Sequence, residues 1–366
     1  MQNKLQFAAV FLLLLVAIST ATPATAPAVP EFRQALGPRE WAFPRDHGRH
    51  DGFKTEWWYF TANLQDDAGH RFGYQLTFFR TAIAPGVADR PSPWAMHDLY
   101  FAHAAISDID GGKFTFKDHM QRGRPGLAFA SDQTLDVMLL DWSARQTNDG
   151  IVLRASEPGF AIDLKCKEGR GPVLQGPGGV NAKGRERGQA SYYYSMTRLP
   201  TAGTLSIGGR QIHVTGLSWM DHEFSSNALA HNQAGWDWMG LHLANGDDLM
   251  LYRLRDRTGG ADYVSGARIS PDGAAHYLAS TDITMEGAKP WKSPATGAAY
   301  PQEWKLKITG LPGLVVQSEM PGQELITRDS TDVDYFEGAA KVIDDQGRPA
   351  GEGYLEMTGY VKPVGG

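Results

Sequence analysis

The sequence predicts an all-β protein built from two tandem antiparallel β-barrels. Short segments of alternating apolar and polar residues recur along the chain, bounded by Gly, Asp, Asn and Pro, which is typical of strands and turns. The chain has 42 glycines, and helical periods of 3.6 residues are scarce after its N-terminal apolar segment. About 340 of the 366 residues follow that segment, more than one hydrophobic core usually serves, so two domains are expected.

The N-terminal segment is typical of export. Residues 7–18 form an apolar run behind a single charge, Lys4, and small residues follow at 19–21. The run is too short for a stable transmembrane helix, so we expect a signal peptide over 1–21, and a retained anchor is the alternative. Residues 22–40 are expected to be a disordered leader, and the mature protein to be periplasmic or secreted.

The first barrel is expected over residues 41–222 and the second over 223–363. Each holds about eight strands, enough to close an antiparallel barrel around one small ligand. The strands expected in the first are 57–64, 72–79, 99–106, 134–142, 151–155, 160–166, 191–199, 203–207 and 210–215. Those expected in the second are 235–243, 248–255, 263–269, 281–286, 303–309, 314–318, 333–342 and 353–361.

Two hairpins that begin with tryptophan support the tandem arrangement. One opens with Trp57 and Trp58, passes through an Asp/Gly turn and ends at Arg80. The other opens with Trp236 and Trp238 and passes through an Asn-Gly turn. Two copies of one barrel plan would place such hairpins in corresponding positions.

Charge and cysteine content exclude some classes of function. The formal net charge of −6 argues against a nucleic-acid partner and against docking on anionic lipid. A local basic cluster, Lys183, Arg185 and Arg187, falls in a Gly-rich loop and is expected to be solvated. The single cysteine, Cys166, excludes an internal disulfide and is expected in the core.

Large aromatic side chains are the main signal for a ligand site. Strand alternation puts Trp57 and Tyr59 on one face of their strand, and Trp236 and Trp238 on one face of theirs. Such side chains either fill a barrel or wall a cavity for an apolar ligand, and their position near the domain junction favours the cavity. The candidate ligand-binding residues are Glu56, Trp57, Tyr59, His103, Tyr194, Trp219, Trp236, Trp238 and Tyr252.

The segment 216–224 carries the densest chemistry, and Asp221, His222 and Glu223 are the candidate catalytic residues. If the strand from residue 210 continues this far, both carboxylates project to one side and the imidazole to the other. Beside the indole of Trp219, a carboxyl group has a raised pKa and can donate a proton. In the alternative, these groups pair with arginine or backbone amides and tie the two barrels together.

Other sites have weaker support. His103, Tyr194 and Tyr252 are isolated polar side chains, and for His103 a hydrogen-bonded core position is the alternative. His47 and His50 could form a metal site in a loop, but no third cluster matches them, so neither a metal nor a cofactor is expected. The chain has no Gly-x-Ser-x-Gly elbow, no phosphate-binding glycine loop and no His-Glu-x-x-His helix, which argues against serine hydrolase chemistry.

Three longer motifs, residues 54–60, 216–224 and 353–360, together with the shorter segments 173–176, 190–195 and 335–339, resemble one family. This is the AttH-like, carotenoid 1,2-hydratase-related family of lipocalin-like proteins, and the resemblance spans residues from about 45 to 362. It implies two lipocalin-like (calycin) barrels with a ligand space near their junction. Members are described as predicted secreted hydrolases or as AttH proteins found beside export-type transporter components. Relatives include carotenoid hydratases and cyclases of polyene substrates.

The chain departs from the hydratase pattern at one position. His222 and Phe224 match the His-plus-aromatic motif of these hydratases. Their Tyr-x-Asp pair is best matched by Tyr252 and Leu254, so the proton-donating aspartate is replaced by leucine. An alkene would then have to be protonated by another acid. The candidates are Asp221, Glu223 and Asp237.

The sequence therefore predicts a periplasmic lipocalin-like protein that holds an apolar lipid or isoprenoid-type ligand in an aromatic pocket. Two alternatives stay open: a hydratase or lyase that uses Asp221, His222 or Glu223 in acid–base chemistry, and an accessory protein of an export-type transporter.

Overall fold

The computed structural model describes residues 31–85, 96–227, 229–328 and 330–364. Within these ranges the chain forms 23 β-strands and three short 3-10 helices, and it forms no α-helix. Among the described helices, none has the length and apolar character needed to cross a bilayer. The expected signal peptide over 1–21 and the first part of the expected leader lie outside the described residues.

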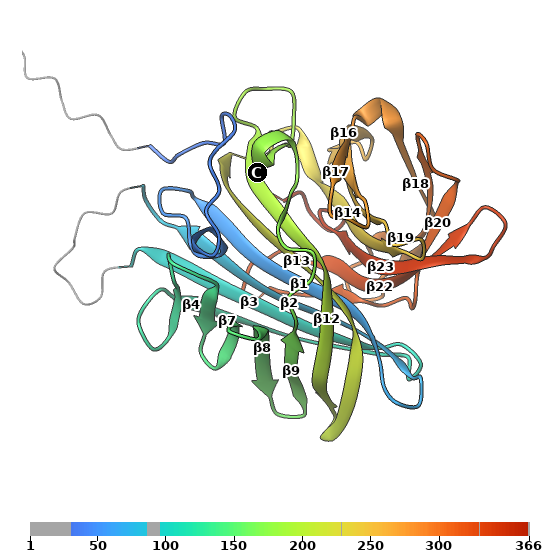
Figure 1. Cartoon of the computed structure of the whole chain (residues 1–366), viewed down its shortest axis with the longest axis horizontal. Coiled ribbons are helices and arrows are strands. Elements are labelled where there is room, and N and C mark those ends of the chain that lie inside the picture. Colours follow the sequence, from blue (N-terminus) through green and yellow to red (C-terminus); the bar gives the residue numbers. More distant parts are fainter. Residues whose placement is uncertain (1–30, 86–95, 228, 329, 365–366) are drawn as a thin grey trace, which may run out of the picture. The chain divides into compact units, whose positions relative to one another are not determined.

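The first sheet contains 13 strands (Figure 1). They are β1 (Thr55–Gln65), β2 (Arg71–Ala82), β3 (Asp98–Asp108), β4 (Lys113–Arg122), β5 (Ala128–Ala130), β6 (Asp136–Leu139), β7 (Trp142–Thr147), β8 (Gly150–Glu157), β9 (Phe160–Cys166), β10 (Val173–Leu174), β11 (Val180–Ala182), β12 (Ala190–Ile207) and β13 (Arg210–Asn227). The hydrogen-bonded order is β4-β3-β2-β1-β13-β12-β9-β8-β7-β6-β5, and β10 and β11 pair with β12. The 3-10 helices η1 (Arg45–His47) and η2 (Pro177–Gly179) accompany this sheet.

The second sheet contains 10 strands. They are β14 (Gln233–Leu243), β15 (Asp248–Asp256), β16 (Ala261–Ile269), β17 (Ala275–Leu278), β18 (Ile283–Lys292), β19 (Ala299–Ile308), β20 (Leu314–Ser318), β21 (Glu324–Leu325), β22 (Tyr335–Asp344) and β23 (Pro349–Met357), with η3 (Ser280–Asp282) before β18. The order is β17-β16-β15-β14-β23-β22-β20-β19-β18, and β21 pairs with β22.

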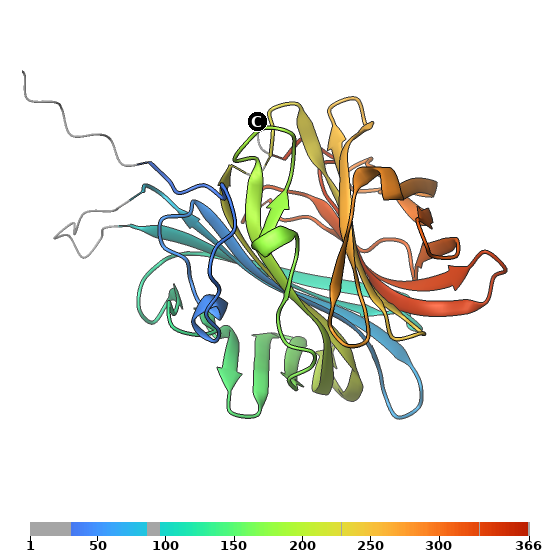
Figure 2. The same cartoon turned by 45° about the horizontal axis from the view of Figure 1, so that its top comes forward.

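Every strand pair that is described is antiparallel, and each sheet curls around its own core (Figures 1 and 2). The prediction of two tandem lipocalin-like barrels is confirmed. The described main paths hold eleven and nine strands rather than about eight each. The longest strand not predicted from the sequence is β4, a sheet-edge strand whose alternation is broken by Lys117 and Asp118 and whose side chains are mostly half-buried.

The three largest of five apolar clusters organise the described part of the molecule. One fills the first sheet and contains Trp58, Phe60 and Cys166, which is buried as expected. A second fills the second sheet. The third lies between the sheets and includes Tyr59 and Trp238. Because β1 contributes to both the first and the third cluster, both of its faces are buried, and this explains its run of consecutive aromatic residues.

Polar side chains fasten the two sheets to each other. The carboxylate of Asp248, in the second sheet, accepts hydrogen bonds from Thr197 (2.7 Å) and Arg198 (2.8 Å) of β12 and from Arg170 (2.9 Å) of the β9–β10 connection. Asn63 on β1 donates to the carbonyl of Gly353 on β23 at 2.8 Å. The last strand of the first sheet ends at residue 227 and the second sheet begins at 233, so the expected domain division between 222 and 223 falls inside β13.

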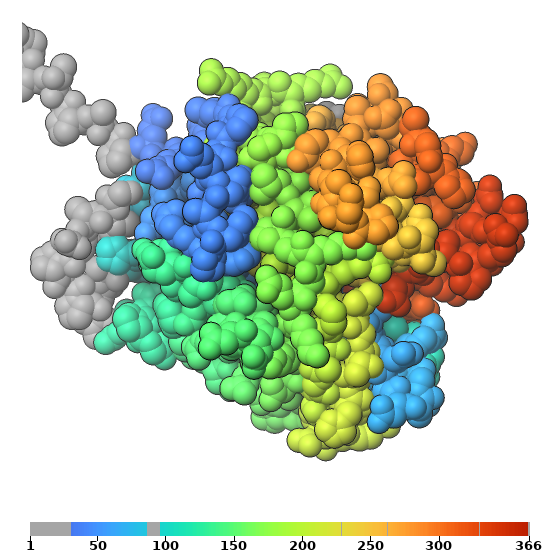
Figure 3. Space-filling model, in the orientation of Figure 1, coloured from blue at the N-terminus to red at the C-terminus, as the bar shows by residue number. Residues whose placement is uncertain are grey.

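Residues 31–53, which we call the N-terminal strap, lie on the first sheet (blue in Figure 3). The hydroxyl of Tyr192 donates to the carbonyl of Gly37 at 2.8 Å, and Trp41 Nε1 donates to the carbonyl of Gly178 at 3.0 Å. Ala35 is buried. The described part of the expected leader, residues 31–40, is thus irregular in structure but packed against the body of the protein.

Candidate functional site

A cavity of about 560 Å³ lies between the two sheets, a volume typical of small-molecule sites. Its walls come from β1, β2, β3, β12 and β13 of the first sheet and from β14, β15, β22 and β23 of the second. Its lining is mainly apolar, but several charged side chains reach it. The sequence-predicted residues that line it are Glu56, Trp57, Tyr59, His103, Asp221, Glu223, Trp236, Trp238 and Tyr252. The predicted residues Tyr194, Trp219 and His222 lie outside its lining.

Aromatic side chains from both sheets form the main wall. Alternation directs Trp57 and Tyr59 of β1, and Trp236 and Trp238 of β14, toward the cavity. The rings of Tyr59 and Trp238 meet edge to face with their centroids 5.3 Å apart. Gly240 follows on the same face of β14, where a Cβ would lie 2.7 Å from the Trp238 ring. The absence of a side chain at Gly240 therefore makes room for the indole of Trp238.

Asp221 is a buried carboxyl group held by uncharged donors. Its Oδ1 accepts hydrogen bonds from Ser195 Oγ (2.5 Å) and Trp219 Nε1 (2.7 Å), and its Oδ2 accepts one from the hydroxyl of Tyr193 (2.8 Å). Burial raises the pKa of Asp221 to about 7, and these hydrogen bonds only partly oppose the effect. An acid with this pKa populates both protonation states near neutral pH, as a general acid or base must.

Glu223, two residues along the same face of β13, forms an ion pair with Lys183 at 2.9 Å. The Lys183 ammonium also lies 4.5 Å from the centroid of the Tyr252 ring. The expectation that this basic cluster is solvated is wrong for Lys183, which is 9% exposed, although the two arginines of the cluster are exposed. The cause is a contact between distant segments: the hydroxyl of Tyr252 donates to the carbonyl of residue 182 and ties the end of β11 to the second sheet.

Glu356 on β23 completes the polar end of the cavity, and the sequence analysis missed it. It is the ladder partner of a cavity-lining residue of β14, so its side chain reaches the same space. Burial raises its pKa to about 7. A hydrogen bond from Trp236 and the charge of Lys183 act in the opposite direction, while Asp221 and Glu223 raise the pKa further.

His222 points to the opposite face of β13, into the interior of the first sheet. Its ring stacks on Trp58 with centroids 4.9 Å apart. Its Nε2 lies 2.8 Å from Glu56 Oε1 and its Nδ1 lies 3.1 Å from the Tyr194 hydroxyl. A carboxylate only accepts, so Nε2 carries the proton and Tyr194 donates to Nδ1, while His47 Nδ1 donates to Tyr194 at 2.7 Å. Burial lowers the pKa of His222 and favours this neutral ring.

The same network holds a buried imidazolium. His50 Nδ1 lies 2.8 Å from Glu56 and its Nε2 lies 3.0 Å from Asp46, so both ring nitrogens donate and the ring is charged. Arg80 Nε donates to Glu56 Oε2 at 3.2 Å. Burial alone would raise the pKa of Glu56, but the hydrogen bonds from His222 and His50 outweigh it and hold that pKa well below its usual range.

His50, Glu56 and His222 are also the residues that could hold a metal ion. One ligand atom from each lies within 4.8 Å of the others, and two histidines with one carboxylate suit zinc. Each of these atoms is already hydrogen-bonded inside the group, and the Arg80 guanidinium lies against the carboxylate. The geometry is therefore that of a network of protons and charges, which joins the N-terminal strap to β1 and β13.

Two other polar residues considered from the sequence are engaged with protein partners. His103 lines the cavity, but its Nδ1 lies 2.7 Å from the Tyr335 hydroxyl and its Nε2 lies 3.0 Å from Ser330 Oγ. Burial lowers the pKa of His103 to about 3, so it is neutral. Asp237 does not line the cavity, and its Oδ2 accepts a hydrogen bond from Arg253 Nη2 at 2.7 Å. Neither residue is placed to donate a proton to a ligand.

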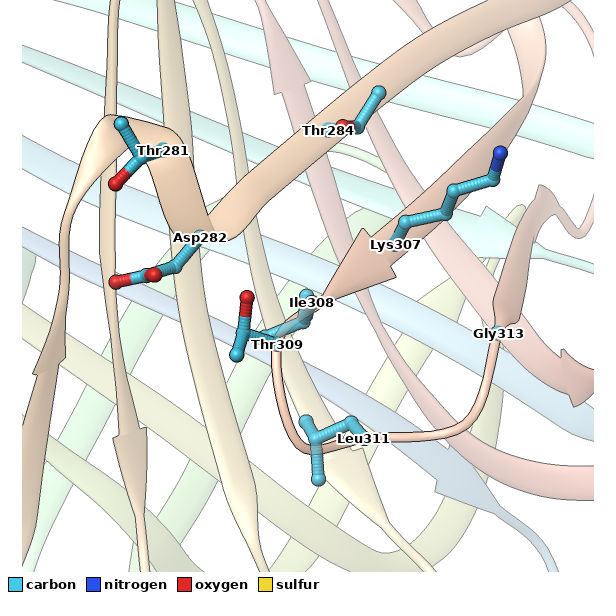
Figure 4. Close-up of a pocket in the computed structure, with 8 residues that line it drawn as sticks. All are labelled: Thr281, Asp282, Thr284, Lys307, Ile308, Thr309, Leu311 and Gly313. Atoms are coloured by element: carbon cyan, nitrogen blue, oxygen red, sulfur yellow. The ribbon is translucent and has the colours of Figure 1, made fainter.

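A second hollow, of about 300 Å³, lies on the second sheet around the start of β18 and the turn after β19 (Figure 4). Its charged lining residues, Asp282 and Lys307, point in different directions in Figure 4. It contains no aromatic wall and no paired carboxyl groups among its described lining. The cavity between the sheets is therefore the candidate functional site.

Comparison with known proteins gives a consistent result. A sequence model of the family described as AttH-like matches residues 34–360. The crystal structure assigned to AttH from Nitrosomonas europaea is 34% identical in sequence, with a TM-score of 0.81, and the match covers 89% of this chain and 100% of that one.

Kievitone hydratase from Nectria haematococca has a similar fold. Its TM-score is 0.68 at 15% identity, and the match covers 92% of this chain and 99% of that one. A comparison with curated proteins finds no match.

Proposed function

The chain belongs to the AttH-like family, and from this premise we propose that it is an exported lipocalin-like protein that holds an apolar small molecule between its two sheets. The ligand is of the lipid or isoprenoid type.

The observation that carries this proposal is the cavity itself. Its main wall is made of Trp57, Tyr59, Trp236 and Trp238. These side chains pack between the sheets and leave the cavity open beside them. Apolar lining with a few placed polar groups is the usual composition of a small-molecule site. Burial of an apolar ligand there is favourable at about 25 cal/mol for each Å² removed from water.

The positions that the resemblance relates to the hydratases favour binding over hydration. Tyr252 and Leu254 both line the cavity, so the second residue of the Tyr-x-Asp pair faces the ligand space without a carboxyl group. His222, the match to the histidine of the His-plus-aromatic motif, lies outside the lining and is hydrogen-bonded to Glu56 and Tyr194.

A hydratase or lyase is the second candidate, and one observation favours it. Asp221 has a pKa of about 7 in a mainly apolar cavity, which is the property a general acid for an apolar substrate needs. Kievitone hydratase shares the fold, although at 15% identity this likeness concerns the fold alone. In this version Asp221 donates the proton, Glu223 is held by Lys183, and His222 acts through the scaffold.

Extraction tests the binding proposal most directly. Protein purified from the exported fraction is treated with organic solvent, and the extract is analysed by mass spectrometry. We expect an apolar molecule in stoichiometric amount, and its addition to stripped protein should change tryptophan emission because Trp57, Trp236 and Trp238 face the cavity. An empty extract together with unchanged emission for every long-chain lipid and polyene tried would contradict the proposal.

The Asp221→Asn variant separates binder from enzyme. If Asp221 is a general acid, binding persists in the variant while any turnover falls by about two to four orders of magnitude. If it is structural, its three hydrogen bonds weaken and the melting temperature, binding and activity fall together. If the parent protein binds its ligand but shows no turnover, only the binding function is supported.

We also propose, from the sequence, that the protein is exported and that it works with a membrane transporter. N-terminal sequencing of the periplasmic fraction should give a mature chain that begins near Thr22. An intact Met1 on a membrane-bound product would overturn the proposed localisation. Copurification with transporter components after mild crosslinking tests the partnership.

A further inference from the structure

The polar end of the cavity carries an excess of acidic groups. Asp221 and Glu223 reach it from β13 and Glu356 from β23, and Lys183 is the ammonium group among them. These four groups influence one another, because the charges of the other three all shift the pKa of Glu356. Three carboxyl groups against one ammonium give this end of the cavity a net negative charge once they ionise.

The two buried cations of the cavity already have partners. Lys183 is paired with Glu223 at 2.9 Å. Arg80 donates to Glu56, to Asp98 (2.7 Å) and to two backbone carbonyls, and it is 1% exposed.

Lys54 also borders the cavity, but it is exposed and precedes β1, five residues before Tyr59, the ladder partner of Asp221. Its charge therefore lies in water at the rim, away from the acidic groups. No described cation of the cavity is free to neutralise an anionic head group at the polar end.

Asp221 and Glu356 differ from Glu223 in having only uncharged hydrogen-bond donors. Asp221 accepts from Tyr193, Ser195 and Trp219, and Glu356 accepts from Trp236. An ionised carboxylate has about four acceptor positions, so each can accept a further hydrogen bond from a ligand. The two come from different sheets, so a single polar group placed between them would be held from both sides of the cavity.

We propose that the ligand carries an uncharged hydroxyl head group, which Asp221 and Glu356 bind, one from each sheet, while carboxylate-headed lipids are rejected. This inference rests on the proposed binding function. A hydroxyl group donates to an ionised carboxylate and accepts from a protonated one, so it fits both states of each acid. A carboxylate only accepts, and it would add a like charge to a desolvated acidic cluster.

Matched probes test the head group. We would titrate stripped protein with 1-dodecanol and with dodecanoate at pH 8, below the concentrations at which either self-associates, and follow tryptophan emission. The two probes share one chain length and differ in the head group. We expect dodecanol to bind at least about tenfold more tightly, equivalent to about 1.4 kcal/mol.

Variants identify the residues responsible. In Glu356→Gln and in Asp221→Asn/Glu356→Gln the preference should shrink, to less than about threefold in the double variant, mainly because dodecanoate gains affinity. The control is Glu168→Gln, an exposed glutamate away from the cavity, which should keep the parent preference. Melting temperatures show whether each variant is folded, and Glu356→Gln alone serves if the double variant is not.

The outcomes separate the two proposals. If neither probe binds, nor any other apolar ligand, the proposed binding function fails. If both bind equally, or dodecanoate binds more tightly, the head-group inference is overturned while the binding function stands. A preference for dodecanol that is unchanged in the folded Glu356→Gln and double variants also overturns it.

Discussion

Two buried acids on opposite sides of β13, Glu56 of the neighbouring β1 and Asp221 of β13 itself, behave in opposite ways. On the face toward the first sheet's interior, His222 bonds Glu56, and the pKa of Glu56 is well below its usual range. On the face toward the cavity, Asp221 is buried to a similar degree, yet its pKa is raised to about 7. Both carboxyl groups accept several hydrogen bonds.

The charge of the donors accounts for the difference. Glu56 accepts from the neutral ring of His222, from the imidazolium of His50 and from the guanidinium of Arg80, and the two cations add an attraction that favours the ionised carboxylate. Asp221 accepts from Ser195, Tyr193 and Trp219, which are neutral. Burial raises the pKa of both carboxyl groups, and only the donors of Glu56, two of which are cations, outweigh it.

The largest expected effect is on the interior face. Glu56→Gln leaves Arg80 and His50 without their buried counter-charge, so the free energy of unfolding should fall by about 3–5 kcal/mol at pH 7. Urea denaturation measures this, with Glu168→Gln as the exposed control. In the parent, the contribution of Glu56 is present above its unfolded pKa of 4.5 and is lost as the pH falls below it toward the folded pKa. The variant should lack this acid-dependent loss, and a variant as stable as the parent would contradict the description of the network.

Asp221 should give the stability of the parent the opposite pH dependence, and Asp221→Asn should remove it. The unfolded carboxyl loses its proton near pH 3.8 and the folded one near 7, so between these values ionisation favours the unfolded state and stability falls as the pH rises. That loss amounts to at most about 4 kcal/mol by pH 8. The variant should lack this decline. Between pH 4 and pH 8 the free energy of unfolding of the variant should therefore rise relative to that of the parent. A difference that does not vary with pH would show that Asp221 is ionised throughout.

Two adjacent tryptophans sharpen the comparison. Trp58 stacks on His222 and donates to the carbonyl of His47 at 2.9 Å, so Trp58→Phe should cost about 1–3 kcal/mol through a lost hydrogen bond and a small void. It should leave the emission change on ligand binding intact. Trp57→Phe should do the reverse, with a smaller stability loss and a reduced emission change, because Trp57 lines the cavity. If the two variants changed stability and the emission response equally, the two indoles would lie in the same environment, which would contradict the comparison.

Neighbouring tyrosines give the smallest effect. Tyr193→Phe removes a donor to Asp221, so the pKa of that carboxyl should rise further. Tyr194→Phe removes a donor to His222 and should leave the pKa of Asp221 unchanged. Each should cost about 1 kcal/mol of stability. Carbon-13 NMR of the labelled carboxyl groups measures the pKa in both variants. A shift in Tyr194→Phe as large as that in Tyr193→Phe would show that the two faces are electrostatically coupled.

Strand alternation was enough to predict much of this arrangement. It placed Trp57 and Tyr59 together, and it put Asp221 and Glu223 on the face opposite His222, because a β-strand has a period of two residues. The two tryptophan hairpins indicated two barrels, and the structure contains β1–β2 and β14–β15 in those places.

Contacts between distant segments could not be predicted in this way. Glu356 of the second sheet lines the same cavity as Asp221 of the first, and Lys183 is buried because its loop is tied to the second sheet. Neither fact has a local signature in the sequence. One signal was present: Glu356 shares a strand face with Tyr354 and Thr358, between apolar neighbours. The histidine network was missed because His50 meets Glu56 and His222 only when the N-terminal strap packs on β13.

The cavity is bounded by strands of both sheets, so a ligand inside it ties together two halves that otherwise meet through clamps such as Asp248 and Asn63. At a free concentration of one hundred times its Kd, such a ligand adds about 2.7 kcal/mol to the folded state. That free energy is lost when either half opens, so it acts on the cooperativity of unfolding as well as on its midpoint. The empty protein should unfold over a broader temperature range than the filled one, and the width of the transition becomes a measure of how much of the protein carries its ligand.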